Sequence, residues 1–249
     1  MIINLPVALT FDIEKDCSPF LNTTRGIEVG LPKILRLLEK YDIECTFFIT
    51  GDVADLFPHH VRQIAERHEV SSHGYIHETF EKMTLPKKKR IRKSKQVLER
   101  VSNQVVIGFR APRFRTSKEL YETLIEVGFK YDSSVACFTP NFLFKTNFPE
   151  FRVQLPSALI NFPKGVEIYS TMCRLITFPV LFFHCWEAVD TRSLLTSADV
   201  NSAYSRGLRP DLWVNTGKVF LEKLEALIRR LLDSGLHFTT LHDVFVSSS

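Results

Sequence analysis

Short apolar runs alternate with helical patterns along most of this chain, and this alternation constrains the fold more than any other feature. Leu5–Phe11, Glu44–Ile49 and Val180–Phe183 have the composition of buried strands. Ile27–Lys40 and Gly217–Ser234 place apolar residues at helical spacing instead. Strands that alternate with helices form parallel sheets covered by those helices. We therefore expect an α/β fold, and the length of 249 residues is typical of an α/β barrel.

The rest of the sequence extends the same alternation. Further helices are expected at Pro58–Arg67, Thr84–Val101 and Ser117–Val127. Further short strands are expected at Glu69–Ser72, Val105–Phe109 and Phe129–Asp132, around Leu155 and Ile168, and at Phe238–Leu241. No internal repeat, low-complexity tract or linker divides the chain, so we expect a single domain over residues 1–249.

The composition excludes several classes of protein. A hydrophobic content of 45% with 24% charged residues excludes a disordered chain. The net charge of +4 is only weakly basic, so no nucleic-acid partner is expected. The five cysteines lack C-x-x-C spacing, and we expect reduced thiols. The first residues lack the pattern of a signal peptide and no apolar run is long enough to span a bilayer. We therefore expect a cytoplasmic protein without a transmembrane segment.

Polar residues with metal-binding chemistry follow two of the expected strands. Asp12, Glu14 and Asp16 come directly after the first strand, where a polar turn would also explain them. His73 and His77 follow the strand at Glu69–Ser72. Histidines at this spacing can share one face of a helical turn and bind one metal ion, although a solvated pair is an alternative. Two imidazoles and a carboxylate form a recurrent catalytic zinc site.

Three more strand ends carry candidate functional residues. Arg110, fixed by Pro112, could hold a carboxylate through a bidentate contact, or it could be a surface arginine in a turn. Asp132 is an acid at a further strand end. His184 directly follows an apolar strand, where a lone histidine is usually structural.

Taken in order along the chain, these motifs resemble the polysaccharide deacetylase family, the NodB-homology or carbohydrate esterase 4 group. The resemblance runs from Asp12 to His184 and includes the segments SHGYIHE, GFRAP and YDSS. It implies a single catalytic domain with a distorted (β/α) barrel of about seven parallel strands. It also implies hydrolysis of an N-acetyl or related N-acyl group on a sugar or glycan precursor.

The resemblance assigns a role to each matching residue. Asp12 matches the general base, and Arg110 matches the arginine that orients it. His73 and His77 match two ligands of a divalent metal, for which the expected ligand set favours zinc. His184 matches the general acid that protonates the leaving amine.

The same resemblance assigns residues to the substrate side of the site. Asp132 matches an acid that lines the groove, and it is also a candidate acidic partner for His184. Pro112 belongs to the arginine motif, and the backbone N–H of Arg113 falls where family members stabilise the oxyanion. Phe182 stands where the family has a leucine, so the acyl pocket is expected to be reshaped. Trp186 is expected to line the sugar groove.

The first motif departs from the family pattern T-F-D-D-G. Ile13 stands where the family has its metal-binding aspartate, so the third ligand must be Glu14 or Asp16, or be absent. Glu14 is preferred because alternate residues of a regular strand share a face, whereas Asp16 could reach the metal from a turn.

The departure keeps other hypotheses open. One is an amide, ureide or formamide hydrolase that needs no metal, and another is a carbohydrate-binding pseudoenzyme. The expected partner is a carbohydrate or a lipid-linked sugar. The basic run Lys87–Lys95 is a solvated helix face or a peripheral contact with an anionic membrane. The sequence leaves the oligomeric state open.

Overall fold

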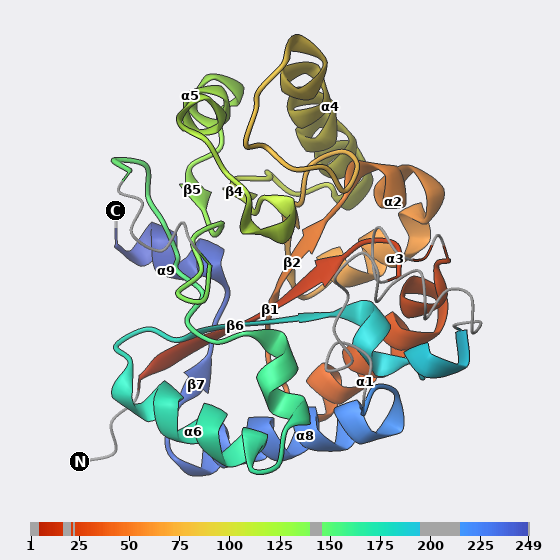
Figure 1. Cartoon of the computed structure of the whole chain (residues 1–249), viewed down its shortest axis with the longest axis vertical. Coiled ribbons are helices and arrows are strands. Elements are labelled where there is room, and N and C mark those ends of the chain that lie inside the picture. The colour runs from red at the N-terminus through yellow and green to blue at the C-terminus, as the bar shows by residue number, and fades with distance from the viewer. Residues whose placement is uncertain (1–4, 17–20, 22, 140–145, 195–214, 249) are drawn as a thin grey trace.

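Seven parallel strands form the centre of the molecule (Figure 1). The computed structural model describes residues 5–16, 21, 23–139, 146–194 and 215–248. The strands along the main path of the sheet occur in the order β5 (Tyr131–Asp132), β4 (Gly108–Phe109), β3 (Glu69–Ser72), β2 (Thr46–Ile49), β1 (Pro6–Ile13) and β6 (Val180–His184). The seventh strand, β7 (His237–Phe238), pairs with the first residues of β1. This curled sheet confirms the expected α/β fold with about seven parallel strands.

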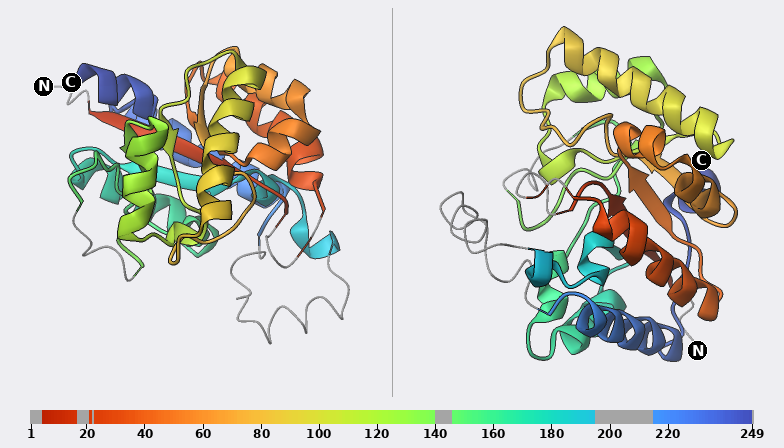
Figure 2. Two further views of the ribbon diagram at one scale, coloured as in Figure 1. Left: turned by 90° about the horizontal axis from the view of Figure 1, so that it is seen from above. Right: turned by 90° about the vertical axis from the view of Figure 1, so that its right-hand side faces the viewer.

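Helices cover the outer side of the curled sheet (Figures 1 and 2). They are η1 (Gly26–Gly30), α1 (Leu31–Lys40), α2 (Gly51–Leu56), α3 (Pro58–Ala65), α4 (Leu85–Ser102), α5 (Lys118–Val127), α6 (Gly165–Leu175), α8 (Lys218–Asp233) and α9 (Leu241–Ser247). Short 3-10 turns occur at η2 (Pro112–Phe114), η4 (Ser157–Asn161), η5 (Cys185–Ala188) and η6 (Thr191–Leu194).

Strands β1, β2 and β6 are largely apolar on both faces because both faces are buried. Leu9, Phe11 and Ile13 of β1 belong to the large core between the sheet and the helices. Phe48 and Phe182 belong to a smaller cluster on the concave side. Parallel strands covered on both faces are expected to form continuous apolar runs of this kind. The concave side is the side on which the polar strand ends converge.

Three helices begin directly after a residue whose side chain caps the first turn. The hydroxyl of Thr84 accepts a hydrogen bond from Lys87 N at the start of α4, and that of Ser117 accepts one from Leu120 N at the start of α5. Thr240 caps α9 in the same way. These contacts satisfy backbone donors that a helix leaves unpaired in its first turn.

Two expected strands are wrong. Ile168 lies in α6, because Tyr169 and Cys173 are buried at helical spacing while Ile168 is 42% exposed. Leu155 lies in no strand, although nearby Val153 forms an isolated bridge with Ala136. At the end of the chain the expected strand is limited to β7, and Leu241 begins α9 instead.

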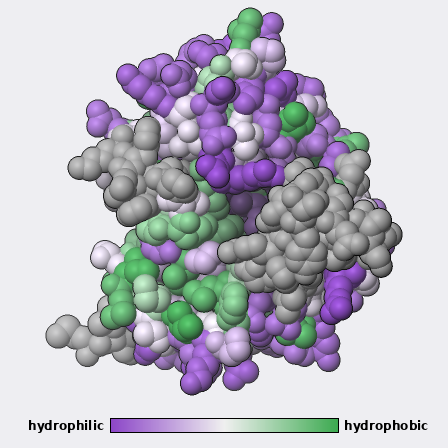
Figure 3. Space-filling model, viewed as in Figure 1, coloured by the Kyte–Doolittle hydropathy of each residue, from purple (hydrophilic) through white to green (hydrophobic). Residues whose placement is uncertain are grey.

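The basic run on α4 is largely paired within the molecule. Arg90 donates two hydrogen bonds of 2.6 Å to Glu78, and Arg92 donates one of 2.8 Å to Glu126. Lys87, Lys93 and Lys95 also have polar partners. These contacts favour a solvated helix face over a membrane contact, and the upper part of the face in Figure 3, where α4 and α5 lie, is mainly hydrophilic. Within the described residues, no helix has the length and apolarity needed to cross a membrane.

Four of the five cysteines lie in the described part of the chain. Cys45, Cys137, Cys173 and Cys185 are free thiols, as expected from the sequence. Cys17 lies outside the described residues.

Candidate metal and catalytic site

Side chains from the carboxyl ends of β1 and β3 meet in one cluster. Glu14, His73 and His77 place one ligand atom each within 4.8 Å of the others. Glu14 Oε2 lies 2.7 Å from His77 Nε2 and 3.5 Å from His73 Nε2. In the part of the chain that the structure describes, this is the one such cluster of candidate metal ligands.

The ring of His73 is held in the orientation that a metal ligand needs. Its Nδ1 lies 2.9 Å from the carbonyl oxygen of Arg110. A carbonyl oxygen can only accept a hydrogen bond, so Nδ1 is the donor in this contact and Nε2 is the nitrogen available to a metal ion. Nε2 is the nitrogen that faces Glu14. Histidines that bind metals typically have their second ring nitrogen fixed in this way.

Glu14 is suited to binding a cation. Burial opposes its ionisation, but the neighbouring His77 and His73 outweigh burial and lower the pKa of Glu14 below its ordinary value. Its Oε2 is buried and receives no hydrogen bond of good geometry from the described residues. A carboxylate oxygen and two imidazole nitrogens around one buried point form a donor set that fits Zn²⁺ and similar divalent ions.

Asp16 has a different environment. Its Oδ2 accepts hydrogen bonds of 2.7 Å from Thr23 Oγ1 and Arg25 N, and its Oδ1 accepts one of 2.7 Å from Gly26 N. Both oxygens are therefore used to hold the start of η1. A Cβ atom at Gly26 would lie 2.7 Å from Asp16 Oδ1 and 2.6 Å from the backbone of Trp186, so glycine is required there. The structure brings Glu14, rather than Asp16, to the two histidines.

Asp12 and Arg110 form a buried ion pair beside this cluster. Arg110 Nη1 donates to Asp12 Oδ1 at 2.7 Å and to Thr10 Oγ1 at 2.9 Å. The guanidinium is fully buried and stacks over the ring of Phe48 at 4.0 Å. The second carboxylate oxygen, Asp12 Oδ2, lies 3.9 Å from His73 Nε2. Arg110 thus fixes one oxygen of Asp12 and leaves the other facing the cluster.

The two serines of the YDSS motif hold the loop that carries Arg110 and Arg113, named here the arginine loop, and the sequence did not predict this role. Arg110 donates to the carbonyl of Ser133 through Nε at 3.1 Å and to Ser133 Oγ through Nη2 at 2.9 Å. Ser134 Oγ accepts a hydrogen bond of 2.7 Å from Ala111 N and donates one of 2.6 Å to Asp132 Oδ1. The motif itself was visible in the sequence, but the direction of each hydroxyl depends on the turn.

Asp132 belongs to a buried acidic pair with Glu150. The two residues form an isolated β-bridge, and Glu150 Oε1 accepts a hydrogen bond of 2.8 Å from Val135 N. Burial raises the pKa of Asp132, and burial together with the charge of Asp132 raises that of Glu150. Two close buried carboxyl groups cannot both ionise readily. The role of Asp132 in this structure is to hold the arginine loop through its hydrogen bond with Ser134.

His184 has an acidic partner other than Asp132, the candidate from the sequence. His184 Nδ1 lies 3.0 Å from Glu187 Oε1, which also accepts a hydrogen bond of 2.9 Å from His184 N. Burial opposes protonation of His184, but Glu187, with smaller contributions from Glu14 and Asp12, raises its pKa to about 9. The imidazole is therefore protonated at neutral pH. In the β1–β6 register, His184 lies opposite Asp12.

The residues expected on the substrate side lie in the arginine loop and next to His184. Arg113 is exposed and has a left-handed backbone with φ 57°, and its N–H has no acceptor among the described residues. Pro112 before it is buried. Phe182 packs edge-on against the ring of His184 at 5.6 Å, and Trp186 stacks on that ring at 4.9 Å. Phe182 and Trp186 thus both pack against the imidazole.

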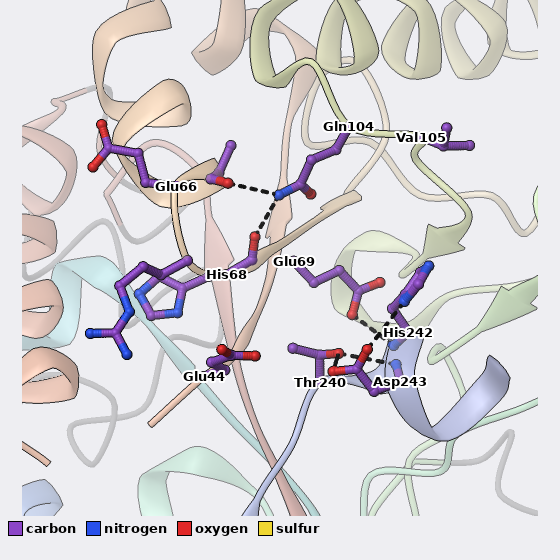
Figure 4. A pocket seen from close by; sticks show the side chains of 11 residues that line it. Glu44, Glu66, His68, Glu69, Gln104, Val105, Thr240, His242 and Asp243 are labelled. Atoms are coloured by element: carbon purple, nitrogen blue, oxygen red, sulfur yellow. Dashed lines mark hydrogen bonds and ion pairs between the residues drawn. The ribbon is translucent and has the colours of Figure 1, made fainter. Parts of the chain in front are cut away.

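A cavity of about 700 Å³ lies at the opposite end of the strands (Figure 4). Its polar lining is used for internal contacts. Gln104 donates hydrogen bonds of 3.0 and 2.8 Å to the carbonyls of Ala65 and His68, and Glu69 Oε2 accepts one of 2.9 Å from His242 N. The amino ends of barrel strands usually serve stability, whereas active sites lie at the carboxyl ends. The cavity is therefore separate from the candidate site.

Comparison with known proteins agrees with the fold and the motifs. Residues 5–131, just over half of the chain, match the sequence model of the family described as polysaccharide deacetylase. The chain therefore belongs to the polysaccharide deacetylase family, as its motifs indicated.

One curated relative is a peptidoglycan deacetylase of Helicobacter pylori. It is 33% identical over 127 residues, which are 48% of this chain and 43% of the relative. The matched region spans less than half the length of each of the curated relatives compared with it.

Solved structures share the fold at low sequence identity. A carbohydrate esterase 4 pseudoenzyme from Bacillus anthracis aligns with 98% of this chain and 66% of its own, with 16% identity and a TM-score of 0.62. Puue allantoinase aligns with 97% of this chain and 89% of its own, with 15% identity and a TM-score of 0.67. These likenesses establish the curled α/β sheet and leave the reaction to be argued from the site.

Proposed function

We propose that this chain is a metal-dependent hydrolase that removes an N-acetyl, or related N-acyl, group from a sugar of a glycan or glycan precursor. The observation that carries the proposal is the cluster of Glu14, His73 and His77 directly beside Asp12. His184, already protonated, lies on the neighbouring strand opposite Asp12. Candidate ligands, a base and an acid thus meet at the carboxyl ends of neighbouring strands.

Glu14, His73 and His77 would hold the cation. A divalent ion supplies Lewis-acid polarisation of the amide carbonyl and makes water a better nucleophile near neutral pH. Zinc is favoured by two imidazole nitrogens and one carboxylate oxygen, and cobalt, manganese or iron would also suit this donor set.

Asp12 is proposed as the general base. Arg110 occupies its Oδ1, and the free Oδ2 faces the cluster, where it can take the proton from an attacking water molecule. The buried guanidinium also holds the carboxylate in one rotamer, which a base must keep throughout the reaction. General acid–base catalysis of this kind contributes about 10²–10⁴-fold to a rate.

His184 is proposed as the general acid. An amine leaving group is strongly basic and must receive a proton as the C–N bond breaks. Glu187 holds Nδ1 and keeps the ring charged, so the Nε2 proton remains for the leaving nitrogen. Stacking of Trp186 on the ring restricts its rotation.

The acyl group and the oxyanion would bind between the arginine loop and β6. The N–H of Arg113, which has no acceptor among the described residues, is a donor suited to the developing oxyanion. Phe182 provides the apolar surface for the acyl methyl group, and its size favours a small acyl group such as acetyl. The similarity to the peptidoglycan deacetylase supports a glycan that carries N-acetylated amino sugars as the substrate class.

The proposal is tested by acetate release from oligosaccharides of N-acetylglucosamine. Activity should be lost after dialysis against a chelator and should return when zinc is added. Activity that survives complete chelation would overturn the metal mechanism and support an amide or ureide hydrolase that needs no metal. Stoichiometric zinc without hydrolysis of any acylated sugar would instead support a carbohydrate-binding pseudoenzyme.

A further inference from the structure

Thr50, at the carboxyl end of β2, has a buried hydroxyl group. The residue is 1% exposed, and its Oγ1 has no hydrogen-bond partner among the residues that the structure describes. Thr50 occupies the N-cap position of α2, where a threonine hydroxyl normally accepts a bond from the first turn. It makes no such bond, and Val53 N is satisfied by Asp52 Oδ1 at 3.0 Å instead. The hydroxyl therefore has no structural role in capping α2.

The strand register places Thr50 between two candidate metal ligands. Ile13 pairs with Ile49. Ile49 in turn pairs with Ser72. Hydrogen bonds from Thr50 N to Ile13 O (3.1 Å) and from His73 N to Ile49 O (2.9 Å) continue the ladder by one residue. The next row across β1, β2 and β3 is therefore Glu14, Thr50 and His73.

The side chain of Thr50 belongs to the concave side of the sheet. Phe48, two residues earlier, lies under the guanidinium of Arg110 on that side. Ile49 belongs to the core beneath the helices. A Cβ atom at Gly51 would meet Tyr75 and Ser94 on the helix-covered side. Because successive strand residues alternate between faces, Thr50 faces the same side as Phe48 and the candidate metal ligands.

We propose that the Thr50 hydroxyl is a positioning group for the metal centre, donating a hydrogen bond to the Glu14 carboxylate when a cation is bound. The inference rests on the metal site of the proposed function. Neighbouring strands lie about 4.8 Å apart, and a threonine hydroxyl can turn among three staggered χ1 positions. Glu14, in the next row on the adjacent strand, carries a buried carboxylate. One hydrogen bond would give the buried Thr50 hydroxyl a partner and would hold that carboxylate in place for the cation.

This role predicts effects of opposite sign in the metal-free and metal-bound protein. A buried hydroxyl without a partner destabilises the fold, so an isosteric valine should stabilise the metal-free protein. The same valine cannot orient Glu14, so it should weaken metal binding. If the Thr50 side chain only filled space, the valine would change the stability of the metal-free protein and its metal affinity in the same direction.

The experiment compares Thr50→Val and Thr50→Ser with the wild type and with the control Thr123→Val. Thr123 is equally buried in α5, but its Oγ1 donates a hydrogen bond of 2.7 Å to Glu119 O, and it lies in no part of the site. Zinc affinity is measured by competition with a chromogenic chelator. The thermal midpoint of each protein is measured after removal of metal.

Thr50→Val should bind zinc about 10–100-fold more weakly than the wild type, which is typical of losing an outer partner of a metal ligand. Its metal-free midpoint should rise by about 2–4 °C. Thr50→Ser should keep close to wild-type affinity, and Thr123→Val should keep the affinity without a higher midpoint.

Equal zinc affinity of wild type and Thr50→Val would overturn the assignment of Thr50 and leave the proposed metal site standing. A lower metal-free midpoint of Thr50→Val would also overturn it, because the hydroxyl would then have a structural partner. Absence of zinc binding by the wild type would refute the metal site itself, and the role of Thr50 with it.

Discussion

Replacing Glu187 by glutamine removes the charge that keeps His184 protonated while retaining the shape of the side chain. The amide oxygen of glutamine can still accept the hydrogen bond from His184 N, which now goes to Glu187 Oε1 at 2.9 Å. The substitution therefore keeps the local backbone and changes mainly the proton affinity of the imidazole.

The size of the effect follows from the pKa of His184. That pKa is about 9, against an ordinary value of 6.5, and Glu187 is the main cause of the increase. Losing an opposite charge in direct contact lowers a pKa by about 1–3 units. For a fall from about 9 to about 7, the protonated fraction at pH 8 drops from about nine-tenths to about one-tenth.

The assay is the pH dependence of kcat for acetate release at saturating zinc. The alkaline limb reports the group that must carry a proton, and it should move to lower pH by about 1–3 units in Glu187→Gln. The acidic limb, which reports the base, should stay in place. A bound cation lowers the pKa of His184 in both proteins, so the difference between them is the quantity that the argument predicts.

A matched control is Glu126→Gln, which removes an exposed carboxylate paired with Arg92 on the outer helices. Its pH profile should coincide with that of the wild type. If the alkaline limb of Glu187→Gln also coincided with the wild type, the assignment of His184 as the acid held charged by Glu187 would be refuted.

Two further substitutions test the supports of the site. Arg110→Met should lower the free energy of unfolding by about 3–5 kcal/mol in chemical denaturation, because it leaves the Asp12 carboxylate buried without its cation; a loss below about 1 kcal/mol would contradict a strong buried ion pair. Asp132→Asn tests the acidic pair with Glu150. Because the folded protein raises the pKa of both acids, the pair favours folding at low pH and opposes it as pH rises through their raised pKa values. The free energy of unfolding, measured by chemical denaturation at a series of pH values, should therefore fall less with rising pH in Asp132→Asn than in the wild type, and an equal fall would refute the buried acidic pair.

The fold could be predicted, and so could the meeting of the strand ends at one edge of the sheet, because both follow from short-range patterns. Apolar runs separated by amphipathic helices require a parallel sheet with covered faces. The carboxyl ends of such strands lie at one edge, so residues following them must be neighbours. This is why Asp12, His73, Arg110 and His184 could be brought together from their order along the chain alone.

The contacts within the site could not be predicted because they depend on how each turn is directed. The choice between Glu14 and Asp16 was open, since only the turn after β1 shows that Asp16 faces the backbone of η1. Glu187 reaches His184 because a 3-10 turn folds it back over three residues. Asp132 was a candidate partner for the same histidine because the sequence does not show the buried Glu150 beside it.

The prediction of a strand around Ile168 was wrong for a related reason. A short apolar run alone does not distinguish a strand from a buried helix. The burial of Tyr169 and Cys173 at helical spacing, which decides in favour of α6, is a property of the packed structure.

The most direct test of the account is the metal content of the purified protein, with Glu14→Ala and Asp16→Asn beside the wild type. We expect about one equivalent of zinc in the wild type and in Asp16→Asn, and none in Glu14→Ala, because Glu14 alone of the two acids faces the histidines. Zinc retained by Glu14→Ala and lost from Asp16→Asn would contradict the ligand set. A wild-type protein that takes up no zinc after reconstitution would contradict metal-dependent deacetylation itself.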